Sequence, residues 1–411
     1  MKIFSRSYNI VISIMLALFI VFLPLSFSNA KNILNKSNKS QHTTQSTIKA
    51  EPKVNVGIIL NTTSVKISAT DEYSIEEISN KYSYNKEISI TNKDGMVAVD
   101  GKSTKKKQIN IKLKNKSDKT IKVNNKEYRG DIKIVAEGKN LTVINNILLE
   151  QYLYGVIKNE MSPEWSIEAV KAQAVAARTY AINQIDANHK NSGFDVCATT
   201  HCQVYSGKSA ETSRAIQAVD ETKGIVIKYK GSPITAYYHS SSGGYTENSE
   251  NVWVSSVPYL KGVVDYDQNS PNYKWEKSFT ATDFNKKLKD AGYNIGSLKK
   301  IQLSSLKTPP VKAEDRGVSG RVKKVEITGT SGKATIDGST MRNIFGLNSA
   351  LFDMKISKGG VIFTGRGLGH GVGMSQWGAK AMAEKASDKE KDYYQKILKH
   401  YYKDVDIEKL Y

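Results

Sequence analysis

The fold is decided by one alanine-rich stretch, Ser162-Pro-Glu-Trp-Ser-Ile-Glu-Ala-Val-Lys-Ala-Gln-Ala-Val-Ala-Ala-Arg-Thr-Tyr-Ala181. Ser162 and Pro163 predict the start of a helix, because proline is tolerated at the first helical position and Glu164 would then lie in the first turn. The apolar residues that recur at helical spacing are Trp165, Val170, Ala174, Ala177 and Ala181. So many small residues predict that this helix packs closely against another element.

A second helix is predicted immediately before this stretch. Either Asn145 or Asn146 is suited to cap it, and its apolar residues are Leu148, Leu149, Tyr152, Leu153 and Val156. Glu160 would then lie just past the helix end, where unpaired carbonyl groups disfavour a carboxylate and raise its pKa. Desolvation by the neighbouring side chains Met161, Trp165 and Tyr154 would act in the same direction.

A glutamic acid that stays protonated near neutral pH suits a general acid, which has to protonate the oxygen of a glycosidic bond. By its spacing alone, however, Glu160 is better explained as an exposed residue that ends a helix. The chemistry therefore needs support from the rest of the chain.

Residues 54–140 are predicted to form a small β-rich region, because short runs rich in β-branched residues are separated there by turn-forming residues. The runs are 54–60, 65–68, 109–113 and 132–135. Residues 141–411 combine the two helices with short strands, turns and a last helix toward Tyr402. The fold class is therefore predicted to be α+β, with mixed strands and short helices in the larger region.

Residues 1–30 differ from everything that follows. Lys2 and Arg6 precede the apolar run Ile10–Phe27, and the small residues Ser28-Asn-Ala30 suit cleavage by a signal peptidase. An uncleaved membrane anchor is the alternative, since roughly 18 apolar residues can just span a bilayer. Both alternatives predict an exported chain, in the cell wall or on the outer face of the cytoplasmic membrane. Residues 31–53 are polar and predict a disordered linker.

The chain has a formal net charge of +20, from 60 lysine and arginine residues against 40 aspartate and glutamate residues. Outside the cell, such an excess predicts attraction to anionic wall polymers or to an acidic membrane surface, and not to nucleic acid. Lysines are densest between Lys102 and Lys126. This run is either a tether to the wall or the solvated face of a strand.

The chain has only two cysteines, Cys197 and Cys202, which lie close to His201 and follow His189. Two thiolates and two imidazoles make a Cys₂His₂ set that completes a structural zinc site. A disulfide that closes a short loop is the alternative in an oxidising compartment, and free thiols are a third possibility. The spacing matches no common zinc finger, so these residues alone do not decide among the three.

Two further segments have compositions that suit a binding site. Ala236–Tyr245 gathers serines, a histidine and aromatic residues that can stack on sugar rings, although a serine-rich hairpin turn after a strand explains its composition better. Gly365–Gly378 begins with glycine at alternate positions, which permits close backbone approach or unusual dihedral angles. Its spacing does not fit a dinucleotide-binding loop.

A serine peptidase of the penicillin-binding type is a weaker alternative. Ser304-Ser-Leu-Lys307 and Ser103-Thr-Lys-Lys106 both fit the Ser-x-x-Lys pattern, but the companion Lys-Thr-Gly and Ser-Asp-Asn elements are missing. A zinc protease has no support either, because the chain contains no His-Glu-x-x-His motif.

Four motifs follow one another along the chain. They are Tyr152-Leu-Tyr-Gly-Val-Ile-Lys-Asn-Glu-Met-Ser-Pro163, Glu168–Tyr180, Tyr238-His-Ser-Ser-Ser-Gly-Gly244 and Gly367–Ala379. Together they resemble the stage II sporulation protein D and amidase-enhancer (SpoIID/LytB) family over about residues 124–402. The chain has Glu-Met-Ser-Pro where this family usually has Glu-Met-Pro, so the loop after Glu160 is one residue longer.

The resemblance implies a lytic transglycosylase that acts on peptidoglycan, with Glu160 as its sole catalytic acid. It also implies one zinc ion held as in clostridial members by Cys197, His201 and Cys202, with His189 as the natural fourth ligand. The residues that fall in segments resembling the family's substrate groove are Gln203, Tyr205, His239, Ser240 and Ser241.

In such an enzyme, the acid protonates the oxygen between MurNAc and GlcNAc and then takes the proton of the MurNAc C6 hydroxyl, so that a 1,6-anhydro end forms without water. The family typically works on glycan stripped of its stem peptides, during engulfment in a sporulating cell and together with a wall amidase. A non-catalytic module that presents glycan to an amidase is the alternative that the enhancer name suggests.

Overall fold

The computed structural model describes residues 50–83, 85–115, 117–185, 189, 192–253, 255–386 and 390–411. The predicted signal peptide or anchor, and the predicted linker as far as residue 49, lie outside these residues. Within the described part of the chain, no helix has both the length and the apolar character needed to span a bilayer. Helices and strands are both abundant in several sheets, which confirms the predicted α+β class.

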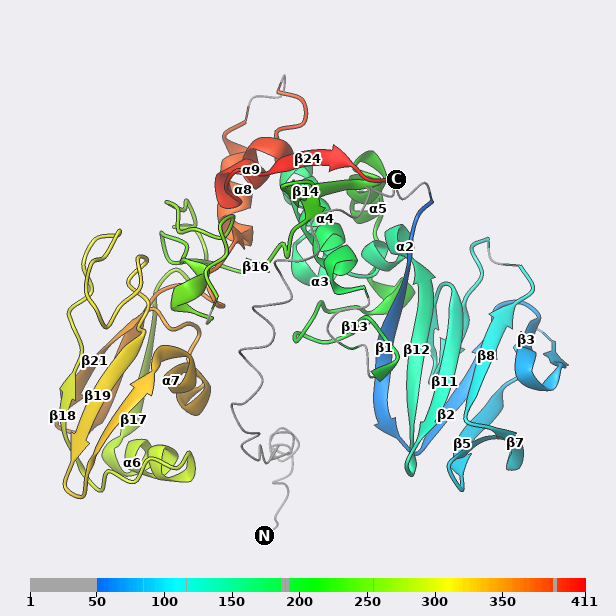
Figure 1. Ribbon diagram of the computed structural model, residues 1–411, viewed down its shortest axis with the longest axis horizontal. Coiled ribbons are helices and arrows are strands. Elements are labelled where there is room, and N and C mark those ends of the chain that lie inside the picture. Colours follow the sequence, from blue (N-terminus) through cyan, green and yellow to red (C-terminus); the bar gives the residue numbers. More distant parts are fainter. Residues whose placement is uncertain are drawn as a thin grey trace, which may run out of the picture. The chain divides into compact units, whose positions relative to one another are not determined.

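The strands of the N-terminal part form two large sheets (Figure 1). They are β1 (Lys53–Thr62), β2 (Ser64–Ala69), β3 (Tyr73–Ile75), β4 (Asn80–Tyr82), β5 (Ile88–Lys93), β6 (Met96–Val99), β7 (Lys102–Lys106), β8 (Gln108–Leu113), β9 (Ile121–Val123), β10 (Lys126–Tyr128), β11 (Asp131–Glu137) and β12 (Asn140–Leu148), with the later β13 (Val196–Cys197). The seven-stranded sheet has the order β13-β1-β12-β11-β8-β3-β4, and the six-stranded sheet has the order β10-β9-β2-β5-β6-β7.

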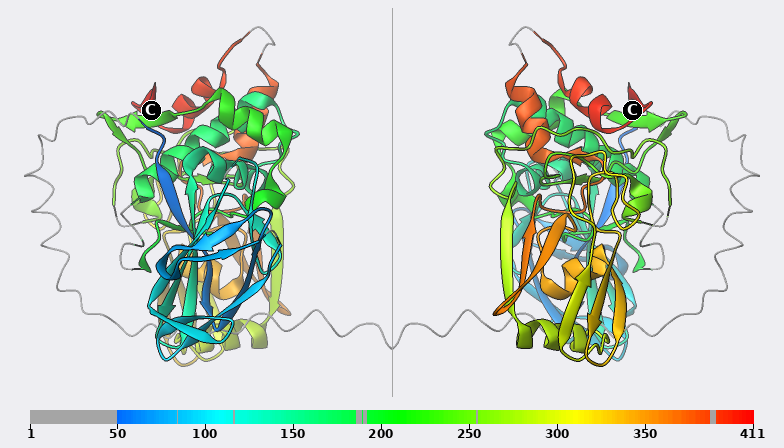
Figure 2. Two further views of the ribbon diagram at one scale, coloured as in Figure 1. Left: turned by 90° about the vertical axis from the view of Figure 1, so that its right-hand side faces the viewer. Right: turned by 90° about the vertical axis from the view of Figure 1, so that its left-hand side faces the viewer.

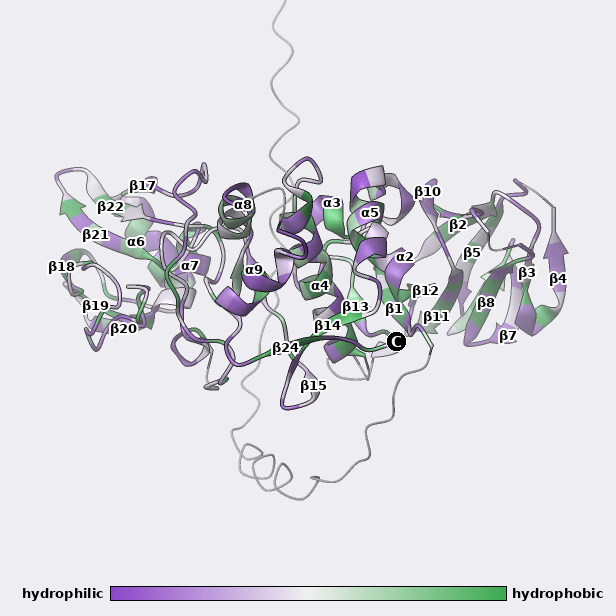
Figure 3. Cartoon of the chain, turned by 90° about the horizontal axis from the view of Figure 1, so that it is seen from above, coloured by the Kyte–Doolittle hydropathy of each residue, from purple (hydrophilic) through white to green (hydrophobic). Residues whose placement is uncertain are grey.

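Alternation of apolar and polar residues explains how these strands pack. In β8, the side chains of Ile109, Ile111 and Leu113 are buried and those between them are partly exposed, and Figure 3 shows the same alternation along the strand. Every second side chain of a pleated strand points to the same face, and the buried faces of both sheets belong to one apolar cluster. The strands predicted at 54–60, 65–68, 109–113 and 132–135 are confirmed.

The structure corrects the start of the helix predicted at Asn145 and Asn146. Both residues lie in β12, where they pair with β1 and β11. The side-chain amide of Asn145 is buried and donates hydrogen bonds to the backbone carbonyls of Arg129 and Asp131. It therefore stabilises the sheet and caps no helix.

Two short helices follow β12 and lead to the long helix α4. They are α2 (Leu149–Tyr154) and the one-turn α3 (Ile157–Glu160). Two helices thus stand where one was predicted, and Glu160 is the last residue of the second and does not lie just past a helix end. Helix α4 spans Ile167–Gln184 and begins after Ser166, not at Pro163 as predicted. Residues 162–165 form a turn instead, closed by a backbone hydrogen bond from Trp165 to Ser162.

Helix α4 is buried on nearly all sides, which confirms the close packing predicted from its alanines. It contacts α5 (Ser213–Glu221), α8 (Gln376–Glu384) and α9 (Tyr394–Tyr401), and Figures 1 and 2 show the last two beside it. Helix α9 is the predicted last helix toward Tyr402. In the middle of α4, the buried guanidinium of Arg178 pairs with Glu150 of α2, with 2.7 Å between Nη2 and Oε2.

Residues 275–365 build a second apolar core with many phenylalanine side chains. Its elements are β17 (Trp275–Thr280), α6 (Ala281–Asp290), β18 (Leu298–Gln302), β19 (Lys324–Gly329), β20 (Lys333–Asp337), α7 (Gly338–Phe345), β21 (Phe352–Ser357) and β22 (Gly360–Gly365). The strands form two three-stranded sheets, β17-β22-β21 and β18-β19-β20.

The remaining strands lie around α4 and the site. A three-stranded sheet contains β14 (Ile225–Tyr229), β15 (Ser232–Pro233) and β24 (Asp406–Lys409), and a parallel pair contains β16 (Tyr238–His239) and β23 (Met374–Ser375). The 3-10 helices are η1 (Glu76–Ile78), η3 (Gly207–Ala210) and η4 (Ser249–Asn251). The predicted division of the chain between residues 140 and 141 stays a prediction.

Candidate active site and metal cluster

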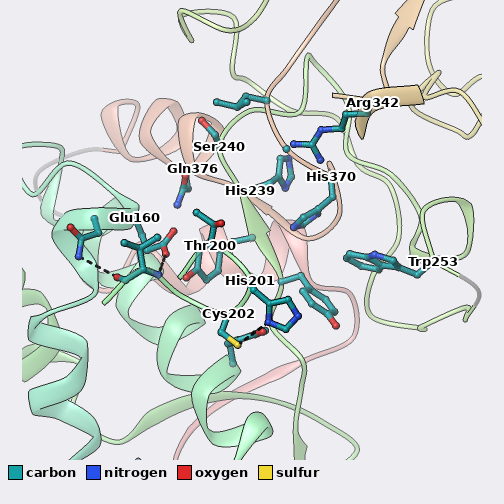
Figure 4. Close-up of a pocket in the computed structure, with 17 residues that line it drawn as sticks. Glu160, Thr200, His201, Cys202, His239, Ser240, Trp253, Arg342, His370 and Gln376 are labelled. Carbon is teal, nitrogen blue, oxygen red and sulfur yellow. Dashed lines mark hydrogen bonds between the residues drawn. The ribbon is translucent and has the colours of Figure 1, made fainter. Parts of the chain in front are cut away.

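A polar cavity of about 860 Å³ lies beside the end of α3. Its wall combines α3, the segment after β13, the strand β16, helix α7 and the glycine-rich segment before β23. Figure 4 shows Glu160 and Gln376 on one side of this cavity and Arg342, His370 and Trp253 on the other.

Glu160 turns its carboxylate into the cavity (Figure 4). Its Oε1 accepts a hydrogen bond from the backbone N–H of Val204 at 3.0 Å, and the Tyr238 hydroxyl and the Gln376 amide also donate to the carboxylate. Burial raises the pKa of Glu160, and these hydrogen bonds oppose the rise without cancelling it. The acid is therefore fixed in position and is still more readily protonated than an exposed glutamate.

Burial in the cavity wall, more than the helix end, accounts for this pKa. Helix α3 has a single turn, and so short a helix sums few peptide dipoles. Tyr154, which was predicted to desolvate the acid, turns elsewhere, because its hydroxyl donates to Asp220 at 2.6 Å. Trp165 packs against Trp377.

Glu160 is the only carboxylate among the described residues that line the cavity. The buried acids Asp265 and Asp267 do not line it, and they accept hydrogen bonds from the hydroxyls of Ser242 and Ser241. A site of this kind offers one proton donor and no second carboxylate to activate water or to attack a sugar.

Of the residues predicted to bind substrate, His239 and Ser240 line the cavity. Gln203, Tyr205 and Ser241 are almost fully buried and do not line it. The Tyr205 hydroxyl donates to Asn145, and the Ser241 hydroxyl donates to an aspartate. The geometry therefore gives these three side chains contacts within the protein.

Gln203 acts on the acid through a neighbour. Its amide oxygen accepts a hydrogen bond from the Tyr152 hydroxyl at 3.0 Å, and its amide nitrogen donates to the Tyr238 hydroxyl at 3.0 Å. Because the Tyr238 oxygen accepts this bond, its own proton can point to Glu160. Gln203 is a positioning residue in this arrangement.

The glycine-rich segment before β23 approaches its neighbours closely, as predicted. Every second residue from Gly367 to Gly373 has a positive φ, a conformation that glycine adopts without strain. A Cβ on Gly371 would lie 2.1 Å from Cζ of Arg321. This path brings His370 to the cavity, and the pairing of β23 with β16 then places Gln376 there.

Several lining residues were not predicted as site residues: Tyr238, Trp253, Arg342, His370 and Gln376. Tyr238, His370 and Gln376 stand inside the recognised motifs, so the sequence held a signal for them. Arg342 and Trp253 stand in no motif. Only the fold shows that they reach the cavity.

The ligand atoms of His189, Cys197, His201 and Cys202 all lie within 4.8 Å of one another, so this cluster can hold a metal ion. The two sulfur atoms are 3.4 Å apart and both thiols are free, whereas a disulfide needs about 2.05 Å. Cys202 Sγ also lies 3.3 Å from His189 Nε2 and 3.4 Å from His201 Nδ1. Two thiols and two imidazoles around one point fit tetrahedral coordination, and the structure favours a metal over a disulfide.

The cluster is connected to the acid. His201 and Cys202 line the same cavity as Glu160, and the next residue but one after Cys202 is Val204, whose N–H holds the carboxylate. An ion in the cluster would therefore fix the segment that positions the acid.

Comparison with known proteins agrees with these features. Residues 137–229 match the family described as Stage II sporulation protein. Stage II sporulation protein D of Bacillus subtilis (strain 168) is 36% identical over 279 residues, which cover 64% of this chain and 75% of the relative. The chain belongs to the stage II sporulation protein D family.

Other relatives extend the comparison. The amidase enhancer of Bacillus subtilis (strain 168) is 35% identical over 291 residues, which cover 61% of this chain but only 39% of the enhancer. An uncharacterized protein of Brachyspira hyodysenteriae is 35% identical over 331 residues, which cover 79% of this chain and 86% of that protein. Residues 254–373 match a domain of unknown function (DUF8618). Membership in the stage II sporulation protein D family links the chain to sporulation and to the cell wall.

Proposed function

We propose that the chain is a peptidoglycan lytic transglycosylase that cleaves the bond between MurNAc and GlcNAc and leaves a 1,6-anhydro-MurNAc end. The observation that carries the proposal is the single carboxylic acid, Glu160, among the described residues that line the cavity. Its raised pKa favours the protonated form that a general acid needs. A glycosidase that uses water needs a second carboxylate about 5–9.5 Å from the first.

One acid suffices because the nucleophile belongs to the substrate. Glu160 donates its proton to the bridging oxygen while the bond from this oxygen to C1 of MurNAc breaks, and an oxocarbenium-like centre develops at C1. The Glu160 carboxylate then takes the proton of the MurNAc C6 hydroxyl, and O6 forms a bond to C1. The proton from the C6 hydroxyl thus replaces the one that Glu160 gave to the leaving GlcNAc, and no water is consumed.

The three donors around Glu160 serve both halves of this reaction. The Val204 N–H, the Tyr238 hydroxyl and the Gln376 amide orient the acid before it donates its proton. After donation they stabilise the carboxylate, because hydrogen bonds to a charged acceptor are stronger than those to a neutral one. Burial acts in the opposite direction and returns the acid to its protonated form.

The cluster of His189, Cys197, His201 and Cys202 is proposed to hold one zinc ion with a structural role. Zinc takes thiolates and neutral imidazoles as ligands, and four of them leave no open position for chemistry. Bound zinc would connect the segment after α4 with the segment after β13. It would thereby support Val204 beside the acid.

The test is digestion of purified glycan strands by the Glu160→Gln and Glu164→Gln variants, with the anhydro-MurNAc ends counted by mass spectrometry. Loss of a general acid is expected to slow their release by about 10²–10⁴-fold. Glu164 is exposed and lies outside the cavity, so its variant is expected to keep the rate of the unchanged protein. Equal release by E160Q and by the unchanged protein would remove Glu160 from the mechanism.

The amidase-enhancer relative favours a second candidate, a non-catalytic module that binds glycan and presents it to a wall amidase. Such a module needs the cavity but not the acid. It predicts that the unchanged protein releases no anhydro ends, and that E160Q accelerates a cell-wall amidase as well as the unchanged protein does.

The proposed place of action is the wall of a sporulating cell, on glycan that has lost its stem peptides. Export would bring the chain there, and its net charge of +20 would hold it near anionic wall polymers or the membrane surface. An N-acetylmuramoyl-L-alanine amidase is the expected partner, because its reaction removes the stem peptides.

A further inference from the structure

Arg342 lies across the cavity from Glu160 (Figure 4). It is half-buried on helix α7, and its Nε donates to the backbone carbonyl of Leu347 at 3.3 Å. Burial lowers the pKa of Arg342, and none of the described carboxylates raises it in compensation. The rest of its guanidinium therefore faces the cavity without a counter-ion from the described residues.

Arg342 differs from the other buried arginines in that no described carboxylate offsets its charge. The buried guanidinium groups of Arg129, Arg178 and Arg316 each pair with a carboxylate of the protein. The fully buried Arg321 has no ion pair and donates to backbone carbonyls and the Ser319 hydroxyl, but nearby carboxylates, that of Glu247 first, raise its pKa against the effect of burial. Partial removal of a charge from water costs free energy unless an opposite charge is near. This cost at Arg342 would be offset if a bound ligand supplied the opposite charge.

A second unsatisfied group lies on the same side of the cavity. The His239 Nδ1 donates to the backbone carbonyl of Val372 at 3.2 Å, so Nε2 has a free lone pair, and this buried atom has no hydrogen-bond partner. The ring of His370 stands 5.4 Å away, centre to centre. Burial lowers the pKa of both imidazoles, to about 3 for His370. Both are neutral at physiological pH, and Arg342 is the only cation among the described lining residues.

Arg342 and the unfilled acceptor of His239 line the same side of one cavity. A guanidinium and an imidazole acceptor placed in this way match a ligand that has a carboxylate next to an N–H or O–H group. MurNAc has this pattern, because the lactyl group on O3 ends in a carboxyl and the neighbouring C2 bears an acetamido N–H. The hydroxyl and acetamido groups of the glycan are neutral. The lactyl carboxyl is charged only after the stem peptide has been removed, since the peptide converts it to an amide.

We propose that Arg342 and His239 form a subsite for the free lactyl carboxylate of MurNAc, which makes the protein selective for glycan without stem peptides. This inference takes its substrate from the proposed function. Arg342 belongs to the segment 254–373 that matches a domain of unknown function. The contribution of that segment to the site is then substrate selection, while the acid comes from the segment 137–229.

The test measures binding to full-length E160Q protein by calorimetry. The two ligands are a GlcNAc–MurNAc tetrasaccharide with free lactyl carboxylates and the same sugar with methylamides in their place. The free acid is expected to bind about tenfold more tightly, because the amide loses a charge-assisted pair with arginine. Adding Arg342→Gln is expected to bring the ratio of the two affinities close to one. Adding Arg342→Lys retains the charge without the planar fork and is expected to give an intermediate ratio.

Arg366→Gln is the matched control, since Arg366 is exposed and lies outside the cavity, and it is expected to leave the ratio unchanged. The ratio of the two affinities separates selectivity from folding, because a misfolded variant binds neither sugar. If the Arg342→Gln variant misfolds, the Arg342→Lys variant decides the test. Equal binding of both sugars by E160Q, or an unchanged ratio in R342Q, overturns the inference. Failure of the proposed function gives a different result from failure of this inference. If only the proposed function is wrong, the unchanged protein releases no anhydro ends, but the affinity ratio still depends on Arg342.

Discussion

At the scale of the residue, the pKa of Glu160 reflects a balance between burial and hydrogen bonds. Because burial prevails, the acid stays protonated to a higher pH than an exposed glutamate. The rate of anhydro-end release is expected to be highest below the pKa of Glu160 in the folded protein, and to fall as the pH rises through it.

Tyr238→Phe removes a donor that favours the carboxylate, so the pKa of Glu160 is expected to rise further. In a pH–rate profile, the falling limb should therefore move to higher pH, with a lower maximal rate because the carboxylate intermediate loses support. Tyr154→Phe is the control, since that hydroxyl contacts Asp220 and lies outside the cavity. A limb that stays in place or moves to lower pH would contradict the role given to Tyr238.

The sequence indicated Glu160 and the cluster of His189, Cys197, His201 and Cys202, but not every side chain that contacts the cavity. Glu160 stands in a motif, and the residues of the cluster are rare types close together in the chain. Gln203 and Ser241 stand in the right segments, yet composition cannot tell which side chains of a segment turn inward to other polar groups. Arg342 reaches the cavity only because α7 folds onto a separate core.

At the scale of the element, the packing of α4 depends on one buried ion pair. Arg178 is bound to Glu150, whose Oε1 also accepts hydrogen bonds from the backbone of Gly224 and the hydroxyl of Tyr411. Arg178→Met leaves a buried carboxylate without its cation. The free energy of unfolding is expected to fall by about 3–5 kcal/mol, measured by urea denaturation.

Lys286→Met provides the comparison for this variant, because Lys286 forms an exposed pair with Asp290 on helix α6. Exposed pairs contribute little to stability, so this variant is expected to unfold at nearly the same urea concentration as the unchanged protein. If R178M and K286M cost the same, the buried pair does not stabilise the packing of α4.

The elements that the sequence predicted well have strong local periodicity. The alternating strands and the alanine-rich helix are of this kind, and both are confirmed. The errors in the prediction lie at the ends of helices and strands, because contacts with residues far away in the chain determine where these elements begin and end. Asn145 is suited to a helix cap, but pairing with β1 and β11 extends β12 past it. Pro163 is suited to a helix start, but a turn at residues 162–165 delays α4.

At the scale of the whole molecule, the site draws on two apolar cores. The first core joins the N-terminal sheets to α2, α3, α4, α5, α8 and α9, and the second contains residues from 284 to 363. The sequence did not predict the second core, because residues 275–365 carry short strands and helices without a change in composition to mark them. Glu160 lies on α3, which packs in the first core, and Arg342 lies on α7, which packs in the second. Both cores are therefore needed to form the cavity.

The metal cluster connects parts of the molecule that are far apart in the chain. Cys197 lies in β13, which pairs with β1 of the seven-stranded sheet, His189 follows α4, and Cys202 lies in the cavity wall. Protein made without chelator is expected to contain close to one zinc ion per chain by elemental analysis.

Removal of this metal by a chelator is expected to act in two ways. The melting temperature should fall by roughly 10 °C, because binding to a site that exists only in the folded state stabilises that state. Below the new melting temperature, the release of anhydro ends should also slow, since the segment that carries Val204 is no longer held against Glu160. The E160Q variant should show the same fall in melting temperature, which separates the structural effect from catalysis. This account would be contradicted if native protein contained no metal and its intact mass were lower by two hydrogens, as a Cys197–Cys202 disulfide requires. The two sulfur atoms would then bind each other and not a shared ion.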